Sequence, residues 1–288
     1  MAVSLQNTKS IMTKKLQLLI SCVMFFTSVT AQETESYLKA NAIRIENPEK
    51  LNDSIYNLLS PYQVIMFGEM HGTNESAPFV NGLAALFSRK GDSTQVGLEI
   101  TPDLMTRFLN LRTDSSVYQS EFFASPPYLD GKESVAWANL ICELNRNKMF
   151  SVFFFDTNRD AVDLRNRDSL MALNLKAQFN KHLSWKMIIL CGNYHNRISN
   201  PACMVSIFKR NNAVKVCSLN MEYKEGTCMA SFSGEGFKEK MLGSYPSVYN
   251  STEGYDRYFV LYPPKSNYDY DGIFYTKNIT AAKIISIK

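Results

Sequence analysis

The sequence lacks the short motifs that mark several large enzyme classes. It contains no G-x-S-x-G nucleophile elbow, no H-E-x-x-H zinc motif, no Walker A loop and no G-x-G-x-x-G fingerprint. Each of these patterns places a serine nucleophile, a zinc ion or the phosphates of a nucleotide at a defined point of a fold. Their absence removes the sequence support for serine-hydrolase chemistry and for nucleotide binding.

The chain also has little net charge once its first residues are set aside. Lys14 and Lys15 precede an apolar run over 16–29, and Val29-Thr30-Ala31 then gives small residues before a polar stretch. This is the pattern of a secretory signal peptide. Removing residues 1–31 takes away three lysines and no acid, so the formal charge falls from +4 to +1. A near-neutral mature chain offers no electrostatic attraction for nucleic acid or an anionic membrane.

The amino-terminal pattern predicts an exported protein, periplasmic or secreted. The apolar run is shorter than the roughly 20 residues that a membrane-spanning helix needs, which favours cleavage over anchoring. Leu19-Ile20-Ser21-Cys22 offers the alternative of a lipoprotein cleaved before Cys22, but Val23 to Phe26 continue the apolar run beyond that cysteine. We therefore expect residues 32–288 to form the mature chain, as a single domain without a stable membrane span.

Cysteine is scarce, and its spacing excludes the common cysteine-based sites. The mature chain has five cysteines, Cys142, Cys191, Cys203, Cys217 and Cys228, and no two of them form a C-x-x-C pair. A zinc knuckle or a thioredoxin-like motif is therefore unsupported. The odd number leaves at least one thiol unpaired within a monomer. Most of these cysteines lie in apolar stretches, where a buried small hydrophobic residue is the simpler explanation.

Strand-like and helix-like segments alternate through most of the chain. Short apolar runs predict strands, and apolar residues at helical spacing predict helices. The expected strands are 63–68, 95–100, 149–155, 185–191, 213–220, 258–262 and 272–275, and the expected helices are 77–89, 101–111, 133–147, 161–179 and 201–210. This alternation is typical of an α/β fold with a largely parallel central sheet, helices on both faces and a mixed edge.

Three local features accompany this pattern. Ser76 is expected to cap the helix that follows it. The stretch 113–132 carries turn residues and is expected to be a long irregular loop near a binding site. The chain beyond Glu222 holds eight of the fifteen tyrosines between Tyr245 and Tyr275, and we expect it to be mostly irregular surface with two late strands.

Chemically capable side chains directly follow four of the expected strands. Glu69 and His71 follow the first, Glu99 ends the second, Asp156 follows the third and His195 follows the fourth. The carboxyl ends of parallel strands meet at one edge of a sheet, so these side chains are expected to converge there. Each residue alone has an ordinary explanation as a cap, a turn former or a backbone partner. Together they could support general acid–base chemistry or hold a divalent metal.

The expected helix 161–179 adds Arg167 and Asp168 beside the same edge. A solvated pair of charges on a helix face is the default explanation, and such a pair contributes about 0–1 kcal/mol. Because the helix starts directly after the strand that ends near Asp156, its first turns lie next to the proposed site. We therefore expect Arg167 to be buried by pairing with Glu69 or Glu99, since a guanidinium can bind a carboxylate with two hydrogen bonds.

Several runs of the sequence resemble the erythromycin esterase-like proteins. In chain order they are Gly68-Glu69-Met70-His71-Gly72-Thr73-Asn74-Glu75, Val96-Gly97-Leu98-Glu99, Arg167-Asp168-Ser169-Leu170-Met171-Ala172-Leu173-Asn174, Gly192-Asn193-Tyr194-His195, and Tyr270-Asp271-Gly272-Ile273-Phe274 with Ile279-Thr280. Glu69 and His71 stand one residue closer together than in the esterases. That spacing is similar to the G-E-x-H form of a wider superfamily, which includes ChaN-like haem-binding lipoproteins and Tiki-like metalloproteases.

The resemblance implies an exported hydrolase that acts on an ester, lactone or amide bond of a small molecule or peptide. It implies catalytic roles for Glu69, His71, Glu99 and His195, with His71 as general base, and substrate contacts for Glu75, Asp156, Arg167 and Asp168. A Tiki-like alternative makes Glu69, His71, Glu99 and His195 ligands of a divalent metal ion that assists the reaction. A ChaN-like alternative makes the chain a haem- or iron-binding protein, with a tyrosine from the carboxyl-terminal region as ligand.

Overall fold

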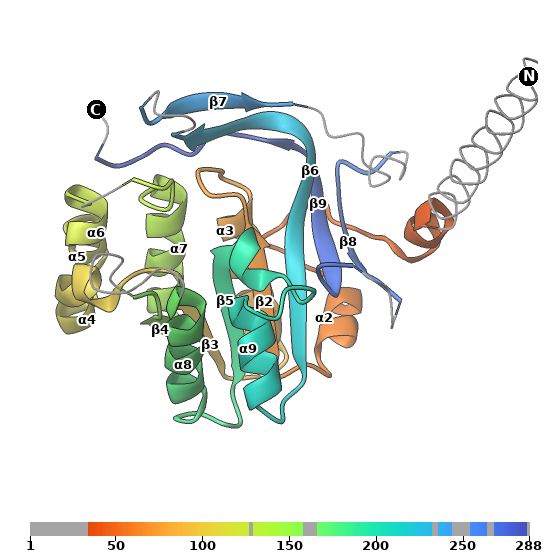
Figure 1. Cartoon of the computed structure of the whole chain (residues 1–288), viewed down its shortest axis with the longest axis horizontal. Helices are drawn as coiled ribbons and strands as arrows, with labels where there is room; N and C mark the ends of the chain where they lie inside the picture. Colours follow the sequence, from red (N-terminus) through yellow and green to blue (C-terminus); the bar gives the residue numbers. More distant parts are fainter. Residues whose placement is uncertain are drawn as a thin grey trace, which may run out of the picture.

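All described strands of the protein form one nine-stranded sheet. The computed structural model describes residues 34–126, 129–157, 166–231, 236–243, 254–263 and 268–286. The predicted signal peptide and Cys22 lie outside these residues, as does the beginning of the expected helix 161–179. The strand order is β1-β8-β9-β6-β2-β5-β3-β4, and β7 pairs with β6 (Figure 1). The strands are β1 Ile43–Arg44, β2 Val64–Glu69, β3 Thr94–Leu98, β4 Phe150–Phe154, β5 Lys186–Gly192, β6 Val216–Ala230, β7 Lys238–Leu242, β8 Arg257–Leu261 and β9 Gly272–Ile279.

The centre of the sheet is parallel and one edge is mixed, as the sequence predicted. Strands β9, β6, β2, β5, β3 and β4 pair in parallel, whereas β8 and β1 add antiparallel neighbours beyond β9. The helices are α2 Asp53–Leu59, α3 Ser76–Arg89, α4 Thr106–Leu111, α5 Asp114–Tyr118, α6 Glu121–Ala124, α7 Val135–Arg146, α8 Arg167–Phe179 and α9 Met204–Asn211. Among the described residues, no helix is long and apolar enough to cross a membrane.

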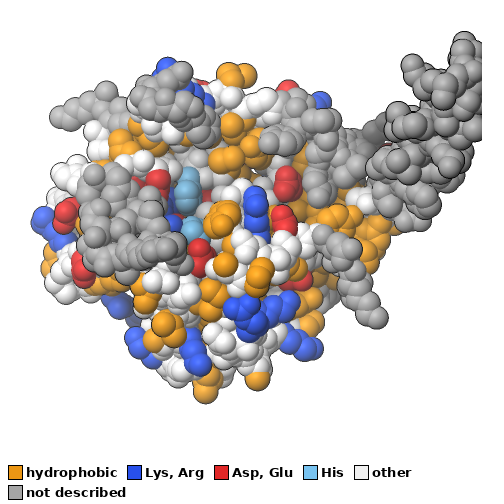
Figure 2. Space-filling model, viewed as in Figure 1, with side chains coloured by type: hydrophobic (Ala, Val, Ile, Leu, Met, Phe, Trp, Pro, Cys, Tyr) orange, Lys and Arg blue, Asp and Glu red, His pale blue; other side chains and the backbone are white. Residues whose placement is uncertain are grey.

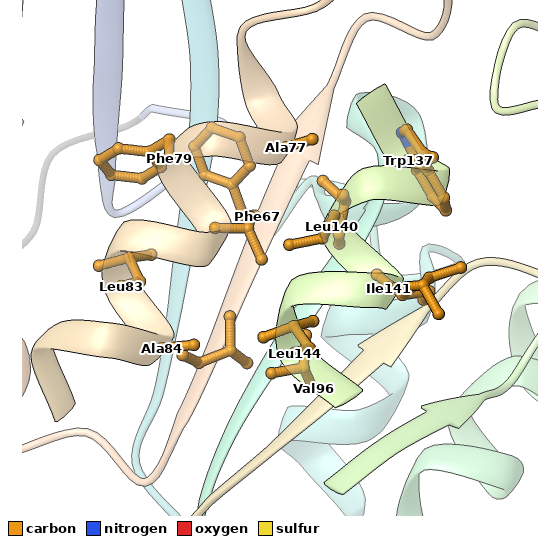
Figure 3. Close-up of a cluster of buried hydrophobic side chains, with 14 of the residues drawn as sticks. Phe67, Ala77, Phe79, Leu83, Ala84, Val96, Trp137, Leu140, Ile141 and Leu144 are labelled. Atoms are coloured by element: carbon orange, nitrogen blue, oxygen red, sulfur yellow. The ribbon is translucent and has the colours of Figure 1, made fainter. Parts of the chain in front are cut away.

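Helices cover both faces of the sheet because the central strands are apolar on both sides. In β2, Ile65 and Phe67 belong to one buried cluster and Val64 and Met66 to another, as the twofold alternation of a strand requires. The first cluster packs under α3 and α7, where Phe67 meets Phe79 with ring centroids 4.9 Å apart (Figure 3). The second cluster packs under α8 and α9 on the opposite face. The sheet therefore forms the middle layer of three.

Three local predictions differ from the structure. Ser76 is the first residue of α3 rather than its cap, and its hydroxyl donates to Glu69. The stretch 113–132 contains two short helices, α5 and α6, instead of a continuous irregular loop. A capping box at Thr113 and Ser116 begins α5, with Ser116 at the position that Glu or Gln holds in the usual sequence signature.

The chain beyond Glu222 is also more regular than expected. Strand β6 continues to Ala230, and β7 pairs with it antiparallel from Gly226 to Ala230. Both strands lie above the carboxyl ends of the parallel strands (Figure 1). Their burial is partial, so the apolar alternation that would reveal a strand is weak there. The two late strands, β8 and β9, are present as predicted.

Candidate functional site

The predicted side chains meet at the carboxyl edge of the parallel sheet. In the register of the strands, Glu69 of β2 lies beside Gly192 of β5, and Leu98 of β3 lies beside Leu190. Glu99 follows Leu98 directly, and its backbone N–H still donates to Leu190 at 3.1 Å. Neighbouring strands therefore end at the same level, and their next residues face one another across a small space.

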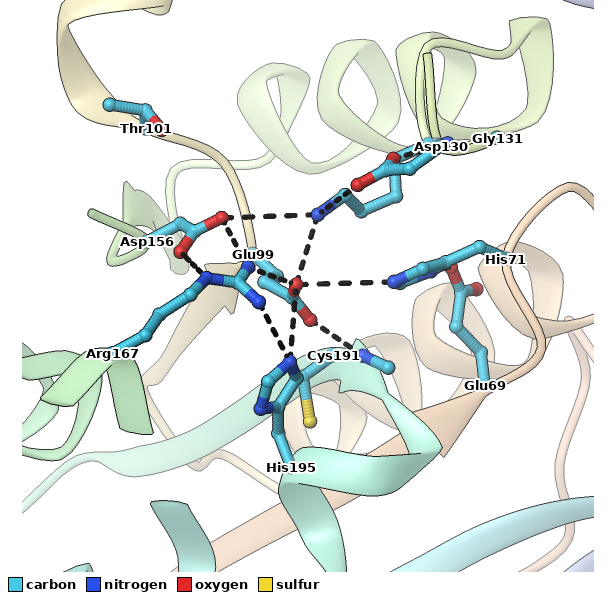
Figure 4. Close-up of polar contacts among 12 residues, drawn as sticks. Glu69, His71, Glu99, Thr101, Asp130, Gly131, Asp156, Arg167, Cys191 and His195 are labelled. Atoms are coloured by element: carbon cyan, nitrogen blue, oxygen red, sulfur yellow. Dashed lines mark hydrogen bonds and ion pairs between the residues drawn. The ribbon is translucent and has the colours of Figure 1, made fainter. Parts of the chain in front are cut away.

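Glu99 lies at the centre of the cluster, where the contacts of the surrounding side chains converge (Figure 4). Its carboxylate is fully buried. Oε1 accepts hydrogen bonds from Lys132 Nζ at 3.0 Å and from Arg167 Nη2 at 2.7 Å, and Oε2 accepts from the backbone N–H of Gly192 at 2.6 Å. The Nε2 atoms of His71 and His195 lie 3.9 and 3.8 Å from Oε1. Two cations and two imidazoles thus surround one carboxylate.

His71 forms a pair with Glu69 at the mouth of this cluster. His71 Nδ1 lies 2.8 Å from Glu69 Oε1, and Glu69 is buried with hydrogen bonds from Ser76 and from Trp137 Nε1. An ionised Glu69 accepts the Nδ1 proton, which leaves Nε2 as the basic nitrogen. Nε2 is too far from Glu99 for a direct hydrogen bond. The lone pair of a neutral His71 therefore faces the space in front of Glu99.

His195 forms a second pair with a carboxylate, but its free nitrogen is engaged. Nδ1 lies 2.9 Å from Asp168 Oδ1, which also accepts the backbone N–H of Met204 at 2.7 Å. Arg167 Nη1 lies 2.9 Å from His195 Nε2 and can only donate, so Nε2 accepts and Nδ1 carries the proton. Of the two imidazoles, His71 is consequently the one placed to take up a proton.

Arg167 is buried and bound on three sides, in agreement with the sequence prediction. It is 8% exposed, and its Nε and Nη2 donate to the two oxygens of Asp156 at 2.9 and 2.7 Å. Nη2 also donates to Glu99, and Nη1 to His195. These contacts use four of the five N–H donors of a guanidinium, and the fifth is on Nη1.

The charges around Glu99 determine which protonation states are favoured. Burial alone would raise the pKa of Glu99, but the adjacent Lys132, the two histidines and Arg167 hold it well below its ordinary value. Burial likewise opposes a charge on His71, and Lys132 adds to that effect. The hydrogen bond to Glu69, with Glu99 and Asp130 nearby, outweighs both and raises the pKa of His71 above 6.5. Glu99 is thus ionised at neutral pH, and the pKa of His71 lies above its ordinary value.

A cavity of about 540 Å³ opens over these groups. Its floor includes Glu69, His71, Glu99, Arg167 and His195, and its upper wall includes Ala230, Ser231 and Phe237 from the β6–β7 region. Figure 2 shows histidine surface beside acidic side chains in a depression of the molecule. Tyr194 and Met70 add apolar surface to the cavity. A volume of this size accommodates a small molecule or a few residues of a peptide.

The sequence prediction missed several residues of the site. Lys132 is 1% exposed and lies 3.0 Å from Glu99 and 3.1 Å from Asp130. Asp130 lines the cavity, and Trp137 binds Glu69. These residues come from the connection between α6 and α7 and from α7, not from a strand end. The stretch 113–132, with its turn at Asp130-Gly131, was expected to be a loop near a binding site, but nothing in the sequence singled out Lys132 or Asp130 within it.

Glu75 does not join the cluster. Its Oε1 accepts hydrogen bonds from the backbone N–H and the hydroxyl of Thr280, at 3.0 and 2.7 Å, and it is not part of the cavity lining. The carboxylate of Glu75 binds the carboxyl-terminal segment of the chain, and its predicted substrate contact stays a prediction. The other seven predicted residues, Glu69, His71, Glu99, Asp156, Arg167, Asp168 and His195, are brought together, and their catalytic and binding roles stay predictions.

The four candidate metal ligands are a poor fit for a divalent ion. Lys132 and Arg167 already neutralise Glu99 Oε1, where a metal would have to bind. Glu69 accepts hydrogen bonds from His71, Ser76 and Trp137, and His195 accepts from Arg167. Within the described ranges, no group of three or more His, Cys, Asp or Glu side chains is arranged to hold a metal ion.

Four described tyrosines of the carboxyl-terminal region pack against one another in stacked pairs. Tyr258 stacks on Tyr275 with ring centroids 4.8 Å apart, and Tyr262 stacks on Tyr268 at 4.1 Å. These residues belong to or pack against a third buried cluster beside β8 and β9. None of these four tyrosines is among the residues that line the cavity. All five described cysteines are buried and free.

Replacing Arg167 by lysine should destabilise the protein although the charge is kept. A lysine cannot reproduce the paired hydrogen bonds to Asp156 together with those to Glu99 and His195. Losing buried hydrogen bonds to charged groups costs about 1.5–3 kcal/mol each, so we expect a fall of at least about 2 kcal/mol in the free energy of unfolding. Denaturant unfolding followed by circular dichroism measures it.

Arg146→Lys is the matched control, because Arg146 forms exposed ion pairs with Asp114 and Glu143. That change should leave the free energy of unfolding unchanged within the precision of the measurement. Equal stability of Arg167→Lys and Arg146→Lys would show that the buried guanidinium contacts contribute nothing specific.

The three-layer α/β fold is represented among solved structures. No protein-family model matches the chain, and no curated protein matches it in sequence. A Bacillus cereus protein shares the fold at 11% identity with a TM-score of 0.62, over 88% of this chain and 99% of that one. A succinoglycan biosynthesis protein does so at 8% identity with a TM-score of 0.61, over 89% and 99%.

The erythromycin esterase EreC is a third structural neighbour. A histidine-to-asparagine variant of it, in the open conformation, superposes with a TM-score of 0.62 at 12% identity, over 83% of this chain and 97% of that one. Identities this low establish a shared fold and nothing finer. The relationship to the esterases is therefore shown at the level of the fold.

Proposed function

We propose that the protein is an exported hydrolase that cleaves an ester, lactone or amide bond of a small molecule or peptide with a water molecule activated by His71. The observation that carries this proposal is the geometry of His71. Its Nδ1 is held by buried Glu69 at 2.8 Å, and its Nε2 faces a cavity of about 540 Å³ in front of Glu99. A fixed tautomer with a basic nitrogen directed at a substrate space is what general-base catalysis requires.

The neighbouring groups supply the other parts of such a reaction. His71 Nε2 takes a proton from water as the oxygen attacks the carbonyl carbon, and returns it to the leaving oxygen or nitrogen. The fifth N–H of Arg167, on Nη1, is a donor for the oxyanion that develops on the carbonyl oxygen. Glu99 keeps Arg167 and Lys132 in place. The esterase activity of the structural neighbour EreC is compatible with this proposal.

A substrate panel tests the proposal directly. Purified residues 32–288 should hydrolyse at least one member of a panel of esters, lactones and peptides. Each reaction is run with and without added divalent metal and with a chelator. Turnover that survives the chelator supports activation of water by His71 alone, whereas turnover restored only by metal would favour the metal-assisted alternative. Binding of haem with a Soret shift, and no hydrolysis of any member, would contradict the hydrolase proposal.

The pH dependence of turnover should report on the pair of His71 and Glu69. Activity requires neutral His71, so the rate should fall as the pH drops through its raised pKa, which lies above 6.5. Glu69→Gln puts a neutral amide in place of the charged acceptor in the hydrogen bond that does most to raise this pKa. The acid limb should then move to lower pH, and the plateau rate should fall by at least about tenfold because the tautomer is no longer fixed.

The control for this profile is Glu143→Gln, which changes an exposed carboxylate of α7. Its acid limb should coincide with that of the parent protein. An acid limb that stays in place in Glu69→Gln would mean that the titrating group is not His71.

The proposed export is tested separately. Cells expressing the full chain should yield a protein that begins at Gln32, as determined by mass spectrometry, in the periplasm or the medium. Lys14→Glu with Lys15→Glu removes the positive charges that precede the apolar run, so unprocessed chain should accumulate. A product that begins at Cys22 and carries lipid would instead establish the lipoprotein alternative.

A further inference from the structure

The carboxyl-terminal segment that follows β9 lies outside the cavity and yet contacts both loops that bring residues to it. We call residues 280–286 the C-terminal strap. Ala282 and Ile284 are each 2% exposed, so the strap is packed against the protein. It runs across the top of the molecule towards the carboxyl terminus (Figure 1).

The strap first pairs with the loop that carries His71. Thr73 forms an isolated antiparallel bridge with Ala281. The backbone N–H of Ala282 donates to Gly72 O at 2.9 Å, and the N–H of Asn74 donates to Thr280 O at 3.1 Å. These bonds begin one residue after His71, so they restrain the backbone on which the imidazole is mounted.

The strap then pairs with the loop that carries Lys132. Ser134 bridges to Ile284, the N–H of Val135 donates to Lys283 O at 2.8 Å, and the N–H of Ile285 donates to Glu133 O at 3.0 Å. Glu133 itself accepts the N–H groups of Asp130 and Gly131 on its side-chain Oε2. The strap therefore binds a loop whose turn at Asp130 and Gly131 is already stabilised by the side chain of Glu133.

The two loops are in direct backbone contact with each other. Gly131 has φ = +100°, and a Cβ built on it would lie 2.5 Å from Gly72 N. Gly72 has φ = +78°, and a Cβ there would lie 2.0 Å from Met229 O of β6. Only glycine allows such approaches and such torsion angles. A shift of either loop therefore moves the other.

Glu75 and Thr280 anchor the start of the strap. Thr280 offers both its N–H and its hydroxyl to Glu75 Oε1, and Asn74 Nδ2 donates to Thr280 Oγ1 at 3.0 Å. Glu75 immediately precedes α3, so the anchor is attached to a long helix of the core.

We propose that the C-terminal strap is a positioning element, anchored by Glu75 and Thr280, that fixes the His71 loop and the Lys132 loop on either side of Glu99. The expected effect of the strap on kcat rests on the proposed hydrolase function, whereas the expected restraint of the two loops does not. Because the strap does not line the cavity, its loosening should leave substrate affinity nearly unchanged and lower the rate of the chemical step.

Two proline substitutions loosen the strap at defined points. Ala282→Pro removes the N–H that binds Gly72 of the His71 loop, and Ile285→Pro removes the N–H that binds Glu133 of the Lys132 loop. Ser286→Pro is the matched control, since the described contacts include no bond from its N–H and its side chain is exposed. Thr280→Val removes the hydroxyl of the anchor without changing the backbone, and Thr280→Ser restores it.

Amide hydrogen exchange followed by mass spectrometry is the primary measurement, since it needs no substrate. Ala282→Pro, Ile285→Pro and Thr280→Val should each raise exchange in peptides covering 69–74 and 129–135, while α9 keeps the protection of the parent. Ser286→Pro and Thr280→Ser should match the parent. If a proline variant fails to fold, the comparison of Thr280→Val with Thr280→Ser tests the proposal instead. Unchanged exchange of both loops in folded strap variants would overturn the proposal.

Kinetics with any substrate found in the panel provide the second measurement. A misplacement of about 1 Å can cost about 100-fold, so kcat should fall by about 10- to 100-fold in the proline variants while KM changes by less than about twofold. Loops that exchange faster with kcat unchanged would overturn the positioning role. If the parent protein hydrolyses no member of the panel, the proposed function is wrong. The exchange experiment still tests whether the strap restrains the two loops.

Discussion

His71→Ala should lower turnover by about 100- to 10,000-fold, which is the usual contribution of a general base. The loss is expected in kcat, because the imidazole is placed to take a proton from water rather than to hold the substrate. The fold should survive the change. Glu69 keeps its hydrogen bonds from Ser76 and Trp137 when His71 is removed, and the His71 side chain is partly exposed at the cavity mouth.

The chain supplies a matched control for this experiment. His182 stacks on Trp185 with ring centroids 4.4 Å apart, away from the cavity. His182→Ala should retain the turnover of the parent, and both variants should show the same circular dichroism spectrum. Full activity of His71→Ala would refute the role of general base and would direct attention to His195.

Glu99→Gln should destabilise the protein more than any other single change of similar size in the site. Glu99 is fully buried and is shared by Lys132 and Arg167. Removing one partner of a buried ion pair costs about 3–5 kcal/mol. We expect the lower end of that range, about 3 kcal/mol, because Asp130 and Asp156 still bind the two cations. Denaturant unfolding at neutral pH gives the value.

The pH dependence of this effect has a defined sign. The pKa of Glu99 in the folded state lies well below its ordinary value of 4.5. The ionised carboxylate therefore contributes stability that is fully present above about pH 4.5 and is lost as the pH falls towards the folded-state pKa. The difference in stability between the parent and Glu99→Gln should be largest near neutral pH and should shrink in acid.

Glu222→Gln provides the comparison. Glu222 is partly buried and accepts a hydrogen bond from Asn220 at 2.8 Å, and burial raises its pKa. Removing its charge should change the stability little at neutral pH. A stability of Glu99→Gln equal to that of Glu222→Gln at pH 7 would mean that the ion cluster is energetically neutral.

The residues at the strand ends could be predicted from the sequence because two simple periodicities determine their place. Apolar runs that end in Glu69, Glu99 and Asp156 identify strands, and alternation with helices makes those strands parallel neighbours. Parallel neighbours in turn bring their carboxyl ends to one edge. Arg167 could be placed because its helix starts close to that edge.

Lys132 and the long second half of β6 could not be predicted in this way. Lys132 reaches Glu99 because Gly131 packs on Gly72. A contact between two loops produces no hydrophobic periodicity in the sequence of either loop. Strand β6 beyond Glu222 is half exposed and paired with short neighbours, so its sequence alternates weakly. The position of Glu75 outside the cluster could not be predicted for a similar reason, since its partner Thr280 lies 205 residues away.

The order in which the chain is synthesised determines when the strap can dock on the two loops. Asn74 and Ala281, which are hydrogen-bonded, lie 207 residues apart. A growing chain can therefore complete the parallel core before the His71 and Lys132 loops are fixed. Contacts between such distant residues are among the slowest to form. A chain in which residues 280–286 have not yet docked would thus hold the His71 and Lys132 loops unaligned.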